Sequence, residues 1–131
     1  MATKSDQLKS ILQRLSTVGG IKASAVISAN GLPMVSLMPE DVDPNTFAAM
    51  LASMVGSAET ALKSLGSKNT LDRVVAESKD IRVVAVQAGT DAILTIMIDP
   101  NTNYGLILLE SKKASDEIAT VMKQSNFIIL V

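Results

Sequence analysis

Cysteine, histidine and tryptophan are absent from the 131-residue chain, and its aromatic residues are one tyrosine and two phenylalanines. Without cysteine there is no disulfide and no thiolate nucleophile, and without histidine there is no imidazole base. Both absences together remove the ligands of almost every transition-metal site. The chain also lacks a glycine-rich phosphate loop and a constellation of carboxylates. We therefore expect no catalytic, metal or cofactor site, and predict that the protein is not an enzyme.

Charge of either sign is sparse as well. The chain has 12 Lys and Arg against 13 Asp and Glu, for a net charge of −1. Nucleic-acid binding needs a clustered excess of basic residues, so we expect neither DNA nor RNA as a partner. No apolar run is long enough to span a membrane, and the polar residues 1–7 do not resemble a signal peptide. These features predict a cytoplasmic location without an integral membrane segment.

Apolar residues, in contrast, make up 47% of the chain. A chain of this length can bury a core in one domain. It carries more apolar material than a lone monomer of this size needs, which favours an additional partner surface. We predict one domain over residues 1–125, followed by an apolar tail over residues 126–131.

The tail contains an uninterrupted apolar run at residues 127–131, which is too short to cross a bilayer. It either tucks onto the surface of its own or a sister subunit, or serves as a docking peptide that adds a strand to a partner. We favour tucking, because an exposed run of this kind promotes aggregation.

Hydrophobic periodicity predicts three helices and five strands. The helices are expected at residues 5–16, 44–65 and 103–124, and the strands at residues 22–28, 33–38, 73–78, 81–87 and 92–98. Asn30-Gly31 favours a tight hairpin turn between the first two strands, and Asp43 before Pro44 is typical of a helix start. The order α-β-β-α-β-β-β-α with short connections predicts an α+β fold, in which helices flank a five-stranded antiparallel sheet.

The central helix is unusual because charged residues appear only toward its end, as Glu59 and Lys63. Its expected core stripe contains Phe47, Met50, Leu51, Met54, Ala58, Ala61, Leu62 and Leu65. Its other side is made of small residues, where a solvated helix would carry Lys, Glu and Arg. These small residues are Ala48, Ala49, Ala52, Ser53, Gly56, Ser57 and Thr60.

Small residues spaced four apart allow another backbone to approach closely. One interpretation is that the first and last helices of the same chain bury this helix on both sides. The other, which we favour, is a protein interface, because five short strands cannot readily wrap a helix of this length. Met50 and Met54 would suit an adaptable interface, although core filling is the simpler role for each methionine alone.

Four segments together resemble the Roadblock family, named for a dynein light chain. They are VGGIKASAVIS at residues 18–28, NGLP at residues 30–33, the alanine-rich helix from Phe47, and NYGL at residues 103–106. The resemblance covers most of the chain, from about Asp6 to about Lys123. It implies the profilin-like Roadblock fold described above.

The resemblance also implies a homodimer in which the third strands pair edge to edge and the two central helices lie side by side. The pairing edge would be Arg73, Val74, Val75, Ala76, Glu77 and Ser78. A second copy or a Ras-like small GTPase would contact Ala48, Ala49, Met50, Ala52, Ser53, Met54, Gly56, Ser57 and Thr60. We therefore predict a dimeric adaptor that docks or regulates such a GTPase, with a paralogue as a possible substitute subunit. An activating role is not carried over.

Two other functions stay open, namely a small-molecule sensory module of the PAS or profilin-like type and a purely structural scaffold subunit. A sensor needs a pocket with converging polar groups, for which the sequence offers little. Arg14, Arg73 or Arg82 could act as an arginine finger, but surface ion pairs are the simpler role. The loop at residues 99–103 could suggest a hard cation, but we expect a turn and a helix cap.

Overall fold

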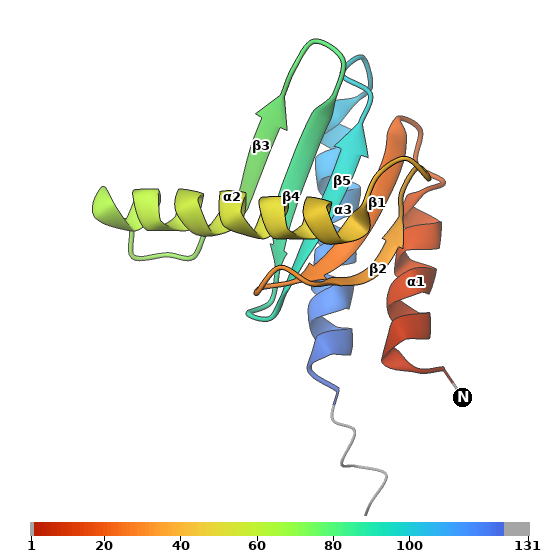
Figure 1. Ribbon diagram of the computed structural model, residues 1–131, viewed down its shortest axis with the longest axis horizontal. Coiled ribbons are helices and arrows are strands. Elements are labelled where there is room, and N and C mark those ends of the chain that lie inside the picture. The colour runs from red at the N-terminus through yellow and green to blue at the C-terminus, as the bar shows by residue number, and fades with distance from the viewer. Residues whose placement is uncertain (1, 125–131) are drawn as a thin grey trace, which may run out of the picture.

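The computed structural model describes residues 2–124 and has the predicted order of elements (Figure 1). The elements are α1 (Lys4–Leu15), β1 (Ile21–Ser28), β2 (Pro33–Leu37), α2 (Pro44–Ser64), β3 (Arg73–Glu77), β4 (Arg82–Ala88), β5 (Ala92–Ile98) and α3 (Tyr104–Met122). The α+β class, the number of strands and the number of helices are therefore confirmed. The predicted tail at residues 126–131 lies outside the described residues.

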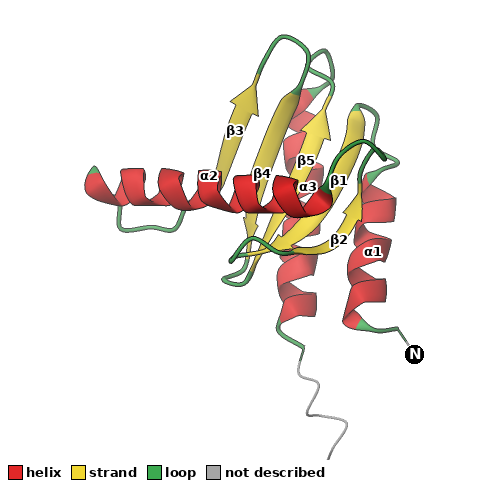
Figure 2. Cartoon of the chain, in the orientation of Figure 1, coloured by secondary structure: helices red, strands yellow, loops and turns green. Residues whose placement is uncertain are grey.

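The five strands form one antiparallel sheet in the order β2-β1-β5-β4-β3. Helices α1 and α3 cover one face of the sheet, and α2 crosses the other face alone (Figures 1 and 2). The interpretation that α1 and α3 bury α2 between them is therefore wrong, because the sheet separates them from it. The larger core lies between the sheet and the α1–α3 pair, and a smaller core lies beneath α2.

The first helix illustrates how local signals fix an element. Thr3 and Asp6 form a reciprocal capping box at its start, in which the Thr3 side chain accepts from the Asp6 N–H. Its buried residues recur at helical spacing and face the larger core. These are Leu8, Ile11, Leu12 and Leu15.

Helix α2 packs on the sheet through Ala48, Leu51 and Val55, which recur at spacings of three and four. The sheet beneath it carries small side chains at its centre, including Ala25 and Ala85, so the helix can lie close to the strands. Only the first part of the helix has sheet beneath it, because α2 runs on past β3 (Figure 1). This arrangement divides the helix into a packed half and a projecting half.

The predicted core stripe of α2 is consequently wrong over much of its length. Met50, Leu62 and Leu65 are exposed, and so is Ala61. Ala61 and Leu62 lie on the projecting half and Leu65 caps its end, where residues 2–124 provide no sheet to pack against. Met50 points outward because the core face of the helix is centred on Ala48, Leu51 and Val55.

Two loops meet at Gly20, where the turn after α1 approaches the turn before α3. Gly20 has a φ of +96°, and its carbonyl accepts a 2.9 Å hydrogen bond from the Asp99 N–H. A Cβ added to Gly20 would lie 2.1 Å from Cγ2 of Thr102. The position therefore requires glycine both for its conformation and for the close approach.

We expect Gly20→Ala to lower the free energy of unfolding by at least about 2 kcal/mol, through left-handed backbone strain and overpacking against Thr102. Urea unfolding followed by circular dichroism measures this change. The matched control is Gly19→Ala, because a Cβ at Gly19 meets nothing within 4 Å. Equal stability of the two variants would contradict this account of the turn.

Candidate protein-interaction surface

The exposed part of α2 has two distinct sides. The small-residue side consists of Ala49, Ala52, Ser53, Gly56 and Thr60, which share a helix face at spacings of three and four. The methionine side consists of Met50, Met54, Ala61 and Leu65. Ser57 lies on the crest between them. Charge appears only on the projecting half, where Lys63 lies 3.3 Å from Glu59, so α2 presents neutral surface over about its first three to four turns.

The small-residue side has an intramolecular role that the sequence did not reveal. The hairpin turn between β1 and β2 rests against it, so that a Cβ added to Gly31 would lie 3.4 Å from Cα of Ala49 and 3.5 Å from Cβ of Ala52. Ala49 and Ala52 are therefore small partly because a backbone of the same chain approaches them. Gly56 differs, since a Cβ there would meet nothing within 4 Å.

The methionine side is markedly apolar for a solvent-facing helix surface. Met50 is 65% exposed and Leu65 is 84% exposed. Met54 is half-buried and packs on the smaller core. Core filling, the simpler role proposed for each methionine, is thus wrong for Met50 and partly correct for Met54.

One residue predicted on the interface face lies elsewhere. Ala48 is 0% exposed and faces the sheet, because it is one of the three residues on which the packed half of α2 is centred. Ala52 and Met54 are half-buried. The other predicted interface residues are exposed, namely Ala49, Met50, Ser53, Gly56, Ser57 and Thr60.

Within residues 2–124, the strand predicted as a pairing edge lies at an edge of the sheet, because its only neighbouring strand is β4. The opposite edge, β2, begins with Pro33, and its pairing with β1 shifts register between Val26 and Ile27. Proline and bulges both hinder the addition of another strand. Strand β3 pairs with β4 in continuous register and contains no proline, so it is the better edge for pairing.

Two backbone hydrogen bonds show which residues of β3 direct their N–H and C=O groups away from β4. The Ser78 N–H donates to the Ile81 carbonyl, and the Gln87 N–H donates to the Asp72 carbonyl. Antiparallel bonding alternates along a strand, so the even-numbered residues from 72 to 78 bond to β4. The N–H and C=O groups of Arg73, Val75 and Glu77 therefore point outward in the plane of the sheet, away from β4.

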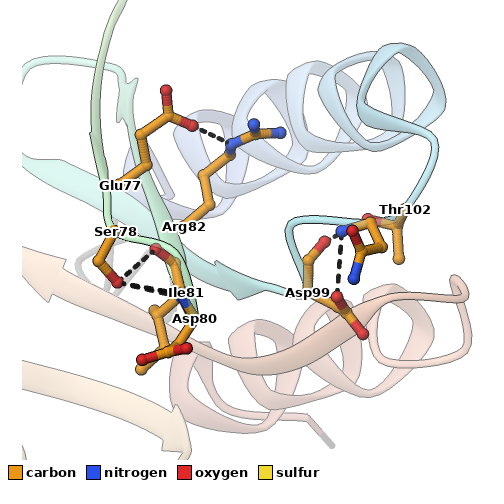
Figure 3. A network of polar contacts seen from close by, with 8 residues as sticks. Glu77, Ser78, Asp80, Ile81, Arg82, Asp99 and Thr102 are labelled. Carbon is orange, nitrogen blue, oxygen red and sulfur yellow. Dashed lines mark hydrogen bonds and ion pairs between the residues drawn. The ribbon is translucent and has the colours of Figure 1, made fainter.

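The side chains of the same three residues lie on the face of the sheet that α3 covers. The Arg82 Nε lies 2.6 Å from Oε2 of Glu77 (Figure 3). The guanidinium carbon of Arg82 lies 4.5 Å from the centroid of the Tyr104 ring. Val75 is 40% exposed. Arg73 forms no ion pair within residues 2–124, so its guanidinium is an unpaired positive charge at the first residue of β3.

Two of the three arginines considered as arginine fingers instead form surface ion pairs, as the simpler interpretation predicted. Arg14 pairs with Glu117, whose hydrogen bonds and negative charge raise the pKa of the guanidinium above its ordinary value. Arg82 pairs with Glu77, as described above. Of these three arginines, Arg73 alone has no ion pair with the described residues.

The loop at residues 99–103 forms the expected turn and cap. The Asp99 side chain accepts a hydrogen bond from the Asn101 N–H. The backbone carbonyl of Asp99 accepts a hydrogen bond from the Thr102 hydroxyl (Figure 3). Asn103 caps α3 by accepting from the Leu106 N–H. Asp99 and Asn103 thus each use a side-chain oxygen to bond the backbone of the loop and of the first turn of α3, respectively.

A groove of about 780 Å³ runs between the start of β3 and α3. Its apolar lining comes from Leu71, Val86 and Leu108, without an aromatic ring among the lining residues. Lys112 and Asp116 line it as well, but they pair with each other at 3.0 Å. Glu59, Asp72 and Arg73 line the groove too. Because none of the described lining residues has an aromatic ring on which a planar ligand could stack, the groove does not favour the sensory alternative.

This αβ fold, with α2 alone on one face of the sheet, also occurs in solved structures of other proteins. The gliding protein MglB from Thermus thermophilus is similar, with a TM-score of 0.85 and 18% identity, covering 95% of each chain. MglB from Myxococcus xanthus gives a TM-score of 0.83 at 23% identity, covering 88% of this chain and 94% of that one. Profilin II of Acanthamoeba castellanii gives 0.63 at 20% identity, covering 85% of this chain and 95% of that one.

Sequence comparison identifies the family. The chain matches the Roadblock/LC7 domain over residues 8–97. Two uncharacterized proteins of Methanocaldococcus jannaschii are 33% and 32% identical to it over 108 residues, covering 82% of this chain and 93% of each relative. The chain therefore belongs to the Roadblock/LC7 family. Across residues 2–124, no helix combines the length and apolar composition that crossing a bilayer requires.

We expect Gly56→Ala to raise the free energy of unfolding by about 0.5–1 kcal/mol, because alanine is the better helix former and the site is open. Urea unfolding at low protein concentration measures the effect. The control is Gly31→Ala, which should destabilise the protein because Gly31 has a φ of +91° and touches α2. A loss of stability in Gly56→Ala would show that the fold itself requires this glycine.

Proposed function

We propose that the protein is a non-enzymatic, dimeric adaptor that docks a Ras-like small GTPase. The observation that carries this proposal is helix α2, whose exposed surface of small and apolar residues runs across the sheet and past its open edge, with Glu59 and Lys63 as its charged residues (Figure 1). Such a surface is costly for a monomer to expose and suits a protein partner. The lack of histidine, cysteine and a phosphate loop supports a binding role over a catalytic one.

The projecting half of α2 supports the dimer. A second subunit joined at β3 would continue the sheet beneath this half, where it would cover Leu62 and Leu65. A two-fold axis at the edge would give both subunits identical contacts, so the assembly would stop at two copies. One symmetric contact would then satisfy the open edge and the overhanging helix together.

Membership of the Roadblock/LC7 family supports the GTPase. The resemblance of the sequence to this family implies contact with Ras-like GTPases, with the central helices as the platform. In the proposed dimer, surface of α2 that the second copy leaves uncovered would be available to the GTPase. Gly56 is the best marker of that surface, because its small size serves no contact within the described chain.

Replacing Leu65 with Asp should weaken the dimer at least about tenfold, since burial of a leucine contributes about 1.5–3 kcal/mol. The fold should be unaffected, because Leu65 is 84% exposed within one subunit. Sedimentation equilibrium measures the dissociation constant. The matched control is Leu109→Asp on α3, where the leucine is also exposed but lies on the other face of the sheet. Equal dissociation constants for both variants would contradict the placement of the dimer contact.

Affinity capture tests the GTPase, with the purified protein as bait in a lysate of the source cells. One arm contains a non-hydrolysable GTP analogue and the other contains GDP. We expect recovery of a Ras-like GTPase preferentially in one nucleotide state. Recovery of scaffold or motor subunits alone, in both arms, would favour the structural alternative and contradict the proposal.

Gly56→Arg serves as the blocked variant in this experiment, because it places a long, charged side chain on the exposed helix. It should reduce GTPase recovery severalfold while the protein stays folded. Thr120→Arg on α3 is the matched control, since this residue is also exposed and lies on the face of the sheet opposite α2. Equal recovery with both variants would remove α2 as the docking surface.

A further inference from the structure

We propose that the edge of β3 carries a self-complementary pattern that selects a second copy of this same chain and fixes its register on Val75. The inference rests on the proposed dimer and goes beyond it by naming the pairing residues and the kind of subunit accepted. Three observations carry it: the outward backbone groups, the alternation of charge along the edge, and the unpaired Arg73.

The backbone sets the number of hydrogen bonds available. Arg73, Val75 and Glu77 each direct an N–H and a C=O away from the sheet. If a two-fold axis passes beside Val75, then Val75 faces Val75 of the partner subunit and Arg73 faces Glu77 of the partner subunit. All three outward residues then form hydrogen-bonded pairs, each of which exchanges two bonds. No outward donor or acceptor of β3 is left without a partner.

Moving the two-fold axis from Val75 to the residue before or after it reduces the number of backbone hydrogen bonds between the two β3 strands. An axis beside Val74 pairs Arg73 with Val75 of the partner subunit, and Glu77 then falls opposite the loop before β3. An axis beside Ala76 pairs Val75 with Glu77 of the partner subunit, and Arg73 falls opposite Lys79 of the partner subunit. In either case only two of the three outward residues find partners within the strands. The register on Val75 is therefore the best bonded.

Side-chain charge favours the same register. Arg73, Val75 and Glu77 share one face of the strand, so the edge reads positive, apolar, negative. Antiparallel pairing on Val75 sets each Arg73 against Glu77 of the partner subunit, on both sides of a central valine pair. Opposite charges directly across a ladder stabilise it, and like charges destabilise it. The alternative axis beside Ala76 would instead oppose Arg73 and Lys79.

The existing ion pair extends this arrangement. Glu77 uses Oε2 for Arg82, which leaves its other carboxylate oxygen for a second donor (Figure 3). Arg73 has no competing ion pair within residues 2–124. In the dimer each Glu77 would lie between Arg82 of its own subunit and the partner's Arg73. Charges would then alternate across three neighbouring strands.

This pattern discriminates between subunits. A second copy supplies the complementary charges by symmetry, whereas a paralogue would fit only if its edge carried the same order of charges. Like charges across the edge would penalise other subunits. The structure thus favours the homodimer over a heterodimer.

Charge exchange tests the pattern with two variants, Arg73→Glu and Glu77→Lys. Alone, each variant places like charges at both symmetry-related pairs, so its dimer should dissociate at least about tenfold more readily than wild type. Mixed together, the two variants restore opposite charges at both pairs and should form a heterodimer in preference to either homodimer. Native mass spectrometry of the mixture, at low salt, measures the three species.

Two further exposed charges serve as controls, Lys22→Glu and Glu40→Lys, which change net charge equally but lie away from β3. Their mixture should give the statistical distribution of dimers. Statistical mixing of the Arg73 and Glu77 variants, or wild-type affinity in either one, overturns the pattern.

Register is tested directly by Val75→Cys, which is convenient because the natural chain has no cysteine. Across the proposed axis the two Cα atoms would lie about 5.5 Å apart, within the range that a disulfide bridges. Mild oxidation should give a covalent dimer on a non-reducing gel. Ile81→Cys is the matched control, since Ile81 is 44% exposed against 40% for Val75 but would lie far from its symmetry mate. Cross-linking of both variants, or of neither, overturns the register.

These results separate the two proposals. If Val75→Cys cross-links and the charge variants pair selectively while no GTPase is captured, the β3 pattern stands and the GTPase function fails. If the GTPase is captured by a protein that is monomeric at all concentrations, the function as a docking platform survives and the β3 pattern is overturned.

Discussion

The backbone of β3 is the constraint on which the rest of this structure depends. Hydrogen-bonding groups along an edge strand need either protection or a partner, and the two edges of this sheet differ in that respect. Pro33 and an irregular register blunt the β2 edge, whereas β3 is regular and carries the exposed Val75. Helix α2 overhangs the same side. In the proposed dimer, this edge and this helix would together form one half of the contact between the subunits.

Most of the fold could be predicted from the sequence because its signals are local. The spacing of Leu8, Ile11 and Leu12, the cap at Thr3 and the Asp43-Pro44 start each depend on a few neighbouring residues. Hairpin order likewise made the β3-β4-β5 meander predictable. The pairing of β1 with β5 was not predicted, because those strands are distant in the chain and no turn joins them.

The interaction surface was only partly predictable, for a different physical reason. The sequence showed that α2 carries charge only toward its end, but not how far the sheet extends beneath it. Ala48 was therefore misplaced on the interface, and Leu65 was misplaced in the core. Similarly, the sequence suggested β3 as an edge, whereas the outward direction of the Val75 backbone depends on its register with β4. Such features arise from contacts between elements, which no single segment encodes.

Amide hydrogen exchange along β3 at several protein concentrations tests the central claim most directly. The amides of Val74 and Ala76 fall on the side bonded to β4 and provide an internal reference, whereas that of Val75 has no acceptor within residues 2–124 of one subunit. The account predicts that protection of the Val75 amide increases with concentration until it approaches that of its neighbours. Rapid exchange of Val75 at every concentration, with its neighbours still protected, would contradict the account.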